Sequence, residues 1–374
     1  MPASLRIGID GRILGPRPKG MARYIWELCK GLDVTLPHAE FYLYSREPTG
    51  LSPISNQWHE RSDGAWGRCL PKSLWAVMRP GIMARRDGVD VYWGGAGLIP
   101  LIGLNARSVL GVHDLVYKLM PEAMSSRARW AMKMFFERSL SRADVVVTNS
   151  RGTADRLHAI IGYKADAVVL PGISSNFRPQ PETKIESVLA RHSLSRPYLL
   201  GVGTLEPRKG LDTLVRSFCR LQSTLRLPDH SLVLVGDRGW RDFSLTQLLS
   251  YSGSRINWLG FVEDEELIAL YSGCEVFVYP SKYEGFGMPV LEARACGARI
   301  VTTDSPELHE AGGTDAIYVA PNESGITSGI LAALNSKRNV ALDWRKRSWM
   351  SSSAILAATL TDQYCSYPAF GEVN

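Results

Sequence analysis

The sequence predicts an α/β protein built from two doubly wound, Rossmann-like domains. Three observations support this fold class. Short, continuously apolar runs alternate with helical stretches, the alternation occurs twice along the 374 residues, and charged motifs follow directly after several of the apolar runs. Continuous apolar runs are typical of parallel strands that are buried on both faces, and a chain of this length has room for about two domains.

The predicted elements follow one another along the chain. In the first half, apolar runs predict strands at 5–10, 40–44, 89–93, 108–114, 144–150 and 167–173, with helices at 21–32 and 125–143. In the second half, strands are predicted at 198–203, 231–237, 256–261, 275–281, 299–304 and 317–320, with helices at 210–223 and 263–274. The segment 171–184 is rich in Pro, Ser and polar residues. We therefore expect a first domain at 1–175 and a second at 176–345.

The composition is that of a soluble globular protein, with 45% hydrophobic and 21% charged residues. No run of about 18 apolar residues predicts a membrane span, and the first ten residues lack the apolar centre of a signal peptide. The six cysteines show neither CxxC pairs nor zinc-finger spacing. We expect a cytoplasmic protein with reduced thiols.

Positive charge is concentrated in the first half. Residues 1–175 carry 23 Lys and Arg against 15 Asp and Glu, whereas the remainder carries 20 against 22. Anionic lipid headgroups or a phosphate-bearing acceptor would suit such a basic domain. An ordinary basic surface explains the charge equally well.

Residues 281–293, SKYEGFGMPVLEA, place two carboxylates around a turn from a strand into a helix. Gly285 and Gly287 would let a ligand approach the main chain, and the N–H groups of a helix start bind anions. Glu292, about one turn into the helix, could accept both hydroxyls of a ribose, and Glu284 would face a hydroxyl-rich ring or a developing positive charge. The alternative is an ordinary turn with a solvated Glu284 and a dipole-stabilised Glu292.

A second turn of this kind, EPRKG, follows the predicted strand 198–203. Arg208 and Lys209 beside a helix start at Gly210 suit a diphosphate, although a solvated basic turn is the alternative. The turn matches neither a GxxxxGK nor a GxGxxG motif, which argues against an ATPase or a dehydrogenase. The sequence also lacks an Asp-x-Asp motif and metal-ligand clusters. We therefore expect no metal cofactor, with cationic side chains and helix N-termini binding the diphosphate.

In the first half, His113 and Asp114 end the predicted strand 108–114. His113 would face a ligand at the carboxyl edge of the sheet, or be structural, with Asp114 orienting its ring or capping the next turn. A Gly/Pro loop with Gly20 follows the first strand, and it could close over a ligand or be an ordinary mobile turn.

Together these motifs resemble the retaining glycosyltransferases of the GT-B fold, in family 4. The resemblance covers nearly the whole chain, and its main motifs are EGFGMPVLEA (284–293), GVGTLEPRKGLDTLVRSF (201–218), GVHDLVY (111–117) and DGRILGPRPKGMARYIWEL (10–28). It implies two Rossmann-like domains that face a central cleft. It also implies a C-terminal helix, within 346–374, that packs back on the N-terminal domain.

The resemblance also implies a role for each matching residue. Glu284 and His113 would be catalytic and contact the transferring sugar. The donor diphosphate would be bound by Arg208, Lys209 and Gly20, the ribose by Glu292, and the base at Phe261 and Val262. The backbone of Gly285, Phe286, Gly287, Met288, Pro289, Val290 and Leu291 would contact the donor sugar and phosphate. The acceptor would lie near Arg23, Tyr24 and Asp114.

The implied reaction is retaining transfer of a hexose, with mannose from GDP-mannose favoured. The acceptor would be a glycan or a polyprenyl-linked molecule in the synthesis of a surface polysaccharide such as O-antigen, and no nucleic acid partner is expected. A sugar-nucleotide 2-epimerase of the same fold and a non-catalytic sugar-nucleotide-binding protein are the alternatives. An epimerase would change the sugar without needing an acceptor.

Basic and aromatic residues are mixed at 65–86 and 125–143. This mixture favours peripheral contact with an anionic membrane, here the inner face of the cytoplasmic membrane. An aromatic stripe at helical spacing is also typical of a helix that packs into a core.

Overall fold

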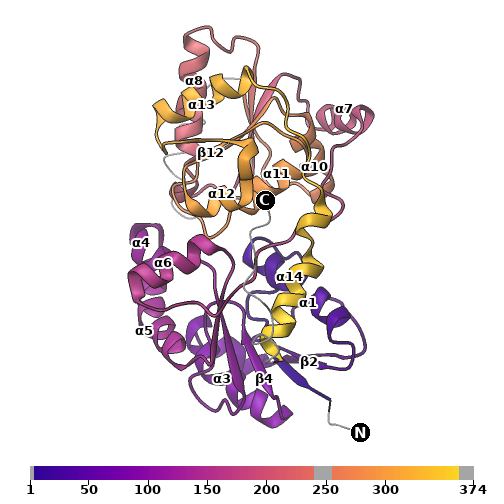
Figure 1. The fold of residues 1–374 in the computed structure, drawn as a ribbon, viewed down its shortest axis with the longest axis vertical. Helices are drawn as coiled ribbons and strands as arrows, with labels where there is room; N and C mark the ends of the chain where they lie inside the picture. The colour runs from indigo at the N-terminus through magenta and orange to yellow at the C-terminus, as the bar shows by residue number, and fades with distance from the viewer. Residues whose placement is uncertain (1–3, 240–254, 362–374) are drawn as a thin grey trace. The chain divides into compact units, whose positions relative to one another are not determined.

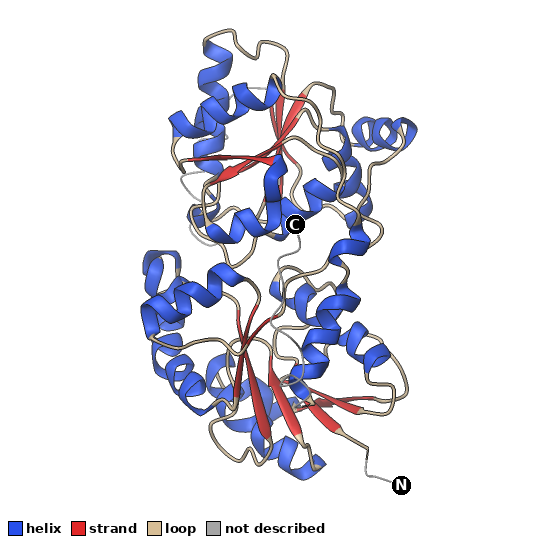
Figure 2. Ribbon diagram, viewed as in Figure 1, coloured by secondary structure: helices blue, strands red, loops and turns tan. Residues whose placement is uncertain are grey.

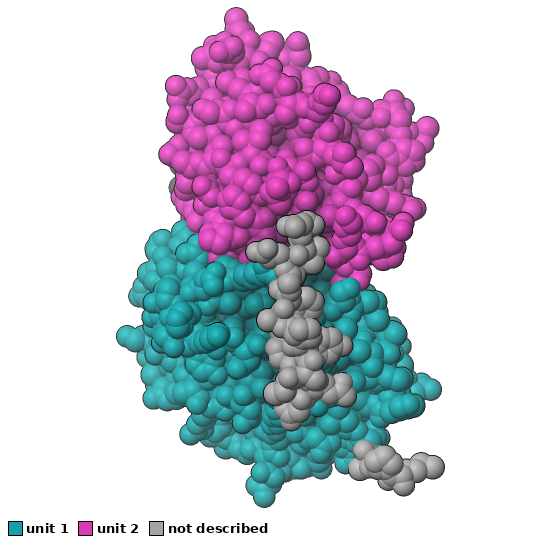
Figure 3. Space-filling view, viewed as in Figure 1, with its two compact units in different colours: residues 1–172, 349–374 teal, residues 173–348 magenta. Residues whose placement is uncertain are grey.

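The computed structural model describes residues 4–239 and 255–361, which form two compact α/β units (Figures 1 and 2). Unit 1 comprises residues 1–172 and 349–374, and unit 2 comprises residues 173–348 (Figure 3). Each unit contains one parallel sheet with helices on its faces. The predicted fold class of two doubly wound domains is confirmed.

Unit 1 is built on a parallel sheet in the order β3-β2-β1-β4-β5-β6-β7. Its strands are β1 (Arg6–Asp10), β2 (Glu40–Ser45), β3 (Trp58–Ser62), β4 (Val91–Gly94), β5 (Arg107–Val112), β6 (Val145–Thr148) and β7 (Ala167–Val168). Its helices are α1 (Met21–Thr35), α2 (Gly64–Cys69), α3 (Lys72–Asp87), α4 (Val116–Leu119), α5 (Ser126–Arg142), α6 (Arg151–Ile161) and α14 (Trp349–Leu360), with a 3₁₀ turn at Pro121–Ala123.

The edge strand β3 was not predicted from the sequence. Of its residues WHERS only Trp58 is buried, and the four polar residues after it are half-buried or exposed, so they form no continuous apolar run. Polar, partly exposed residues are tolerated in this strand because it lies at the edge of the sheet. Pairing with β2, in which Phe41 lies opposite Trp58, places the strand in the sheet.

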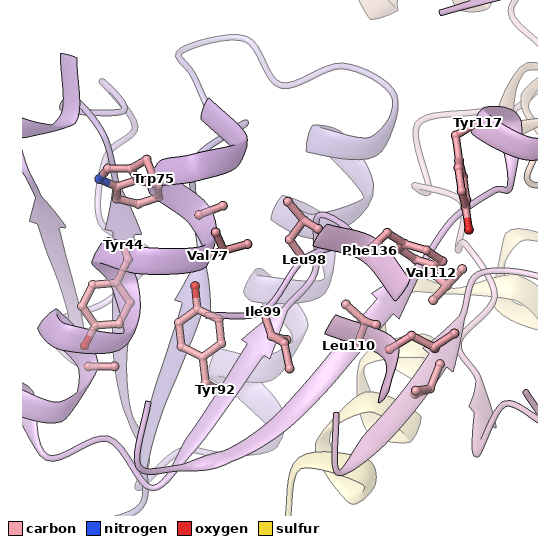
Figure 4. Packing of buried hydrophobic residues seen from close by; sticks show 14 of the residues in the cluster. Tyr44, Trp75, Val77, Tyr92, Leu98, Ile99, Leu110, Val112, Tyr117 and Phe136 are labelled. Atoms are coloured by element: carbon pink, nitrogen blue, oxygen red, sulfur yellow. The ribbon is translucent and has the colours of Figure 1, made fainter. Parts of the chain in front are cut away.

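One hydrophobic core of unit 1 lies between its sheet and helices α3 and α5 (Figure 4). Trp75 of α3 is fully buried, and Phe136 of α5 is only 1% exposed. These two aromatic residues belong to the segments 65–86 and 125–143, whose mixed basic and aromatic composition favours membrane contact. Burial of these rings, worth about 2–3 kcal/mol each, stabilises the fold and removes them from any membrane-facing surface.

Helix α14 returns from the C-terminal part of the chain to pack on α1 within unit 1. The hydroxyl of Ser353 donates to the carbonyl of Leu28, and Trp349 meets the ring of Tyr24 edge-on at 6.0 Å. The small Gly31 makes this approach close, because a Cβ there would lie 2.0 Å from the Ser353 hydroxyl. The predicted region of this helix, 346–374, extends beyond residue 361 and so partly outside the described residues.

Unit 2 has a parallel sheet in the order β10-β9-β8-β11-β12-β13. Its strands are β8 (Tyr198–Val202), β9 (Ser231–Val235), β10 (Ile256–Trp258), β11 (Val276–Tyr279), β12 (Ile300–Thr303) and β13 (Ala316–Val319). Its helices are α7 (Glu182–Arg191), α8 (Leu211–Ser223), α10 (Asp264–Gly273), α11 (Met288–Ala295), α12 (Pro306–Gly312) and α13 (Glu323–Leu334), with 3₁₀ turns at Pro207–Lys209, Gly313–Asp315 and Trp344–Arg347.

Two features of the described residues, 4–239 and 255–361, concern membrane-spanning helices and cysteines. None of the helices in these ranges combines the length and the apolarity needed to cross a lipid bilayer. The cysteines in the same ranges are free thiols, and Cys29, Cys274 and Cys296 are buried. Cys365 lies outside the described residues.

Candidate active site

The motif 281–293 forms the predicted turn from strand β11 into helix α11. Gly287 caps the helix with φ +96°, a conformation that side chains disfavour, and Pro289 lies in the first turn. A Cβ at Gly287 would also lie 2.4 Å from Leu308. Only glycine therefore fits at this helix start.

The donors at this helix start are fewer than the sequence suggested. Pro289 has no N–H group, and the N–H groups of Val290 and Leu291 point to the Gly287 carbonyl at 3.0 and 3.4 Å. Among residues 4–239 and 255–361, the N–H groups of Gly287 and Met288 have no protein acceptor. These two groups are the ones available to an anionic ligand at the α11 N-terminus.

Glu284, which is buried, and the half-buried Arg208 and Lys209 form one charged cluster at the carboxyl edge of the unit 2 sheet. Lys209 Nζ lies 2.7 Å from Glu284 Oε1, and Arg208 Nη1 lies 3.1 Å from Glu284 Oε2. Oε1 also accepts from the hydroxyls of Ser281, at 2.6 Å, and Tyr279, at 2.8 Å. Glu284 is 7% exposed, so the sequence alternative of a solvated glutamate does not hold.

Gly210 is what allows the basic turn to reach Glu284. It has φ +65° and begins helix α8, and a Cβ there would lie 2.2 Å from the carbonyl oxygen of Pro280. The contact is extended by the N–H of Lys282, which donates to the Arg208 carbonyl at 2.9 Å. The two turns therefore pack backbone to backbone, and their side chains converge.

Charge pairing determines the state of Glu284. Burial alone would raise the pKa of its carboxyl, but Lys209 and Arg208 outweigh that effect and lower the pKa to about 2. The same burial lowers the pKa of Lys209, and Glu284 opposes that fall. Glu284 is therefore an anion at neutral pH, which can accept hydroxyl hydrogen bonds or stabilise positive charge but cannot supply a proton.

Glu292 lies inside α11 and is 6% exposed. The hydroxyl of Tyr271, from α10, donates to its Oε2 at 3.2 Å. Burial raises the pKa of Tyr271 well above its ordinary value, and the nearby Glu292 raises it further. The phenol therefore keeps its proton and can donate. Tyr271 thus helps to orient the carboxyl group of Glu292.

The two residues expected at the base differ in exposure. Phe261 is 38% exposed, whereas Val262 is 5% exposed. They follow Gly260, which has φ +68°, and the carbonyl of Gly260 accepts from the N–H of Gly236. Phe261 is thus partly exposed on this turn, whereas the side chain of Val262 is buried.

His113 lies in unit 1 directly after β5 and is 9% exposed. Its Nε2 is 2.5 Å from the carbonyl oxygen of Gly95, and its ring meets Tyr24 edge-on at 5.2 Å. Burial lowers the pKa of His113, against the opposing effects of Gly95 and Asp114, so the imidazole is neutral at pH 7. Because a carbonyl can only accept, Nε2 carries the hydrogen and Nδ1 has a lone pair.

The other unit 1 residues of interest surround His113 or begin α1. Asp114 accepts from the N–H of Val116 at 3.1 Å and thereby caps the next turn. Tyr24 is buried, and its hydroxyl donates to the Val169 carbonyl at 2.7 Å. Gly20 caps α1 with φ +53°, and both Gly20 and Arg23, in the first turn, lie at this helix start.

Sequence reasoning missed three side chains of unit 2: Tyr279, Ser281 and Tyr271. Tyr279 ends β11, and Ser281 lies two residues later, which is the spacing of side chains on one face of an extended chain. That spacing could have identified them as partners of Glu284. Tyr271 comes from a different helix, so no local pattern could have paired it with Glu292.

The described residues, 4–239 and 255–361, contain no group of three or more His, Cys, Asp or Glu side chains placed to hold a metal ion. In unit 2, two cations and a helix start can bind phosphates, and one buried carboxylate can accept from a diol.

Comparison with known proteins identifies the family of the chain. Residues 187–348 match the family Glycosyl transferases group 1, and residues 18–174 match Glycosyltransferase Family 4. The O-antigen chain mannosyltransferase B of Escherichia coli is 35% identical over 245 residues, which cover 63% of this chain and 64% of that protein. The match thus spans less than two thirds of that relative.

Two further similarities extend over most of the chain. A GDP-mannose-dependent alpha-(1-6)-phosphatidylinositol monomannoside mannosyltransferase of Mycobacterium tuberculosis is 27% identical over 93% of this chain and 94% of that protein. The solved structure of sucrose-phosphate synthase from Thermosynechococcus elongatus superposes with a TM-score of 0.77 at 19% identity, covering 97% of this chain and all of that one. The two family matches cover both units, and the fold agrees with them, so the chain belongs to the GT-B-fold glycosyltransferases of family 4, also called group 1.

Proposed function

We propose that this protein transfers a mannosyl residue from GDP-mannose, with retention of configuration, to a glycan or lipid-linked acceptor during synthesis of a surface polysaccharide. The observation that carries the proposal is the charged cluster of Glu284, Arg208 and Lys209 beside the start of α11. Such a cluster suits a sugar diphosphate, because it combines fixed cations with a carboxylate for sugar hydroxyls or developing positive charge.

Mannose and GDP are proposed from the relatives. The E. coli relative is named an O-antigen chain mannosyltransferase, and the mycobacterial relative is named GDP-mannose-dependent. A sugar-nucleotide 2-epimerase or a non-catalytic sensor has no such support among these names.

In the proposed reaction the bond between the sugar C1 and the diphosphate oxygen breaks, and the bond to the acceptor oxygen forms on the same face. Arg208 and Lys209 stabilise the negative charge of the leaving diphosphate, the role that a metal ion has elsewhere. The diphosphate accepts the proton of the acceptor hydroxyl, so no side chain needs to act as the base. Ionised Glu284 stabilises the oxocarbenium-like sugar.

The remaining donor contacts follow from the site. Glu292, oriented by Tyr271, would accept the ribose hydroxyls, and the backbone after Gly260 would contact the base. The N–H groups of Gly287 and Met288 would donate to the sugar or phosphate. His113 would contact the transferring sugar through Nδ1, because Nε2 is bonded to Gly95.

The test is nucleotide release from GDP-mannose, UDP-glucose and a dTDP-sugar, each with and without a polyprenyl-linked acceptor extract. We expect release from GDP-mannose that rises with the extract, and an α-linked product by NMR. Release from another donor would replace GDP-mannose in the proposal. Conversion of the sugar without acceptor would identify an epimerase, and binding without turnover would identify a sensor.

We further propose that the protein works in the cytoplasm at the inner face of the membrane, with α5 in contact with anionic lipid. Trp130 on this helix is 59% exposed. It is flanked by the exposed cations Arg127, Arg129 and Lys133. An exposed indole among basic side chains favours the interface of an anionic bilayer.

A further inference from the structure

A buried ion pair lies at the carboxyl end of β1, between two residues to which no role has been assigned above. Asp10 is 1% exposed, and its Oδ2 lies 3.0 Å from Arg12 Nη1, on a side chain that is 8% exposed. The N–H of Arg12 also points to Asp10 Oδ1 at 3.2 Å. Burying two charges carries a desolvation cost that a well-packed apolar pair would not have. The pair therefore points to a role other than stabilising the fold.

The second arm of the Arg12 guanidinium binds the main chain of a neighbouring turn. Nη2 donates to the carbonyl of Ala96 at 2.5 Å. This turn follows β4, the strand that pairs directly with β1, so the side chain crosses only one strand spacing. Arg12 is therefore bound to Asp10 at one end and to the turn after β4 at the other.

The same turn holds His113. The carbonyl of Gly95, one residue before Ala96, accepts from His113 Nε2 at 2.5 Å. His113 follows β5, which pairs with β4 on its other side. Three neighbouring strands thus end in one connected path, which runs from Asp10 through Arg12 and the peptide of residues 95–96 to the imidazole.

The orientation of the Gly95 carbonyl decides which ring nitrogen of His113 carries the hydrogen. With Gly95 accepting, Nε2 carries the hydrogen and Nδ1 presents its lone pair, which accepts from a sugar hydroxyl. If the turn rotated, the ring could adopt the other tautomer and present an N–H in its place. The adjacent ring of Tyr24 limits the tilt of the imidazole, but it has no bearing on the tautomer.

We propose that Asp10 and Arg12 are positioning residues that fix the tautomer of His113 by holding the turn at residues 94–97. For its effect on catalysis, the inference rests on the proposed glycosyl transfer. Its effect on the ring is independent of any reaction. The pair acts through the Ala96 carbonyl, so Arg12 itself contacts no substrate.

The test is Arg12→Lys, which keeps a charge beside Asp10 but loses the planar fork that reaches Ala96 at the same time. In protein labelled with ¹⁵N-histidine, the His113 signals are assigned by their loss in His113→Gln. We expect one tautomer, with hydrogen on Nε2, in the wild type and a mixture of both in folded Arg12→Lys. We also expect kcat/KM with GDP-mannose to fall about tenfold, the size of a lost charge-assisted hydrogen bond.

Arg79→Lys is the matched control, because Arg79 is paired with Asp63 in the same unit through two short hydrogen bonds and has no link to His113. It should lower thermal stability and leave the His113 tautomer unchanged. In the His113→Gln background, Arg12→Lys should cause no further loss of kcat/KM. Asp10→Asn/Arg12→Gln, a neutral pair, serves if Arg12→Lys does not fold, and it should also give a tautomer mixture.

An unchanged tautomer in folded Arg12→Lys, or an undiminished effect of that change in the His113→Gln background, would overturn the inference. Absence of turnover with every donor in the wild type would instead count against the proposed function. In that case the histidine spectra still decide whether the ion pair positions the ring.

Discussion

Lys209 Nζ lies 2.7 Å from Glu284 Oε1, although the two residues are 75 positions apart in the chain. The contact depends on Gly210, which lets the basic turn lie against the carbonyl of Pro280. A cation that would bind a diphosphate is thus already bound by the carboxylate that would face the sugar. A bound diphosphate would share Lys209 and Arg208 with Glu284.

Glu284→Gln should separate binding from turnover. We expect kcat for mannosyl transfer to fall about 100-fold, because the developing positive charge loses its anionic partner. The Kd for GDP should stay equal or decrease, because the two cations no longer have a competing carboxylate. Isothermal titration and initial rates measure these two quantities.

Glu275→Gln is the control for this change, since it removes an ion pair with Arg299 at the opposite end of β11. It should alter neither quantity by more than about twofold, as expected for a partly exposed pair. A Glu284→Gln protein with normal kcat would rule out the proposed role of this carboxylate.

Acid should weaken the fold through Glu284. Its pKa is lowered from 4.5 to about 2 in the folded protein, so its stabilising contribution is present above about pH 4.5 and is lost as the pH falls towards 2. The pKa difference corresponds to about 3 kcal/mol. In urea denaturation, the stability difference between the wild type and Glu284→Gln should be largest at pH 7 and shrink below pH 4.5. A difference that does not vary with pH would contradict the assigned ionisation.

Lys209→Met should weaken nucleotide binding. We expect the Kd for GDP to rise about tenfold and its salt dependence to decrease, because one cation that would contact the diphosphate is lost. Lys282→Met is the matched control, since Lys282 is an exposed neighbour in the next turn. Equal effects of the two changes would indicate general attraction rather than a specific contact.

Gly210→Ala should be more destabilising than a glycine substitution at positive φ alone. At Gly162, φ is +79° and a Cβ would meet nothing within 4 Å, so Gly162→Ala should cost about 1 kcal/mol. At Gly210 a clash with the Pro280 carbonyl adds to this cost. We therefore expect Gly210→Ala to lower the free energy of unfolding by about 3 kcal/mol and to weaken GDP binding. Chemical denaturation measures both costs, and equal values would mean that the two turns can separate without penalty.

Trp130→Ala should reduce flotation with vesicles that contain anionic lipid at low salt. An exposed indole and its neighbouring cations contribute together, so the bound fraction should fall severalfold and should also fall at high salt. Trp344→Ala is the comparison, because Trp344 is 36% exposed and lies in the basic 3₁₀ turn Trp344–Arg347 of unit 2. No binding by the wild type, or a loss only in Trp344→Ala, would exclude α5 as the contact.

Much of the local structure could be predicted from the sequence. Apolar runs gave the buried strands, and the Gly-Met-Pro sequence at 287–289 gave the start of α11, because these signals lie within a few neighbouring residues. Edge strand β3 could not be predicted for the corresponding reason, since four of its five residues are polar and resemble a loop until β2 pairs with them.

By itself, the sequence determined the fold class, the order of the elements, and which charged residues follow which strands. Only the tertiary structure decided that Glu284 is buried and ionised, that Val290 and Leu291 have already used their N–H groups, and that Arg12 reaches the turn beside His113. Apolar periodicity is a property of neighbouring residues, so it can be read along a chain. Charge states and hydrogen-bond partners depend on groups far apart in sequence, and they are fixed only when packing brings those groups within a few ångströms and excludes water.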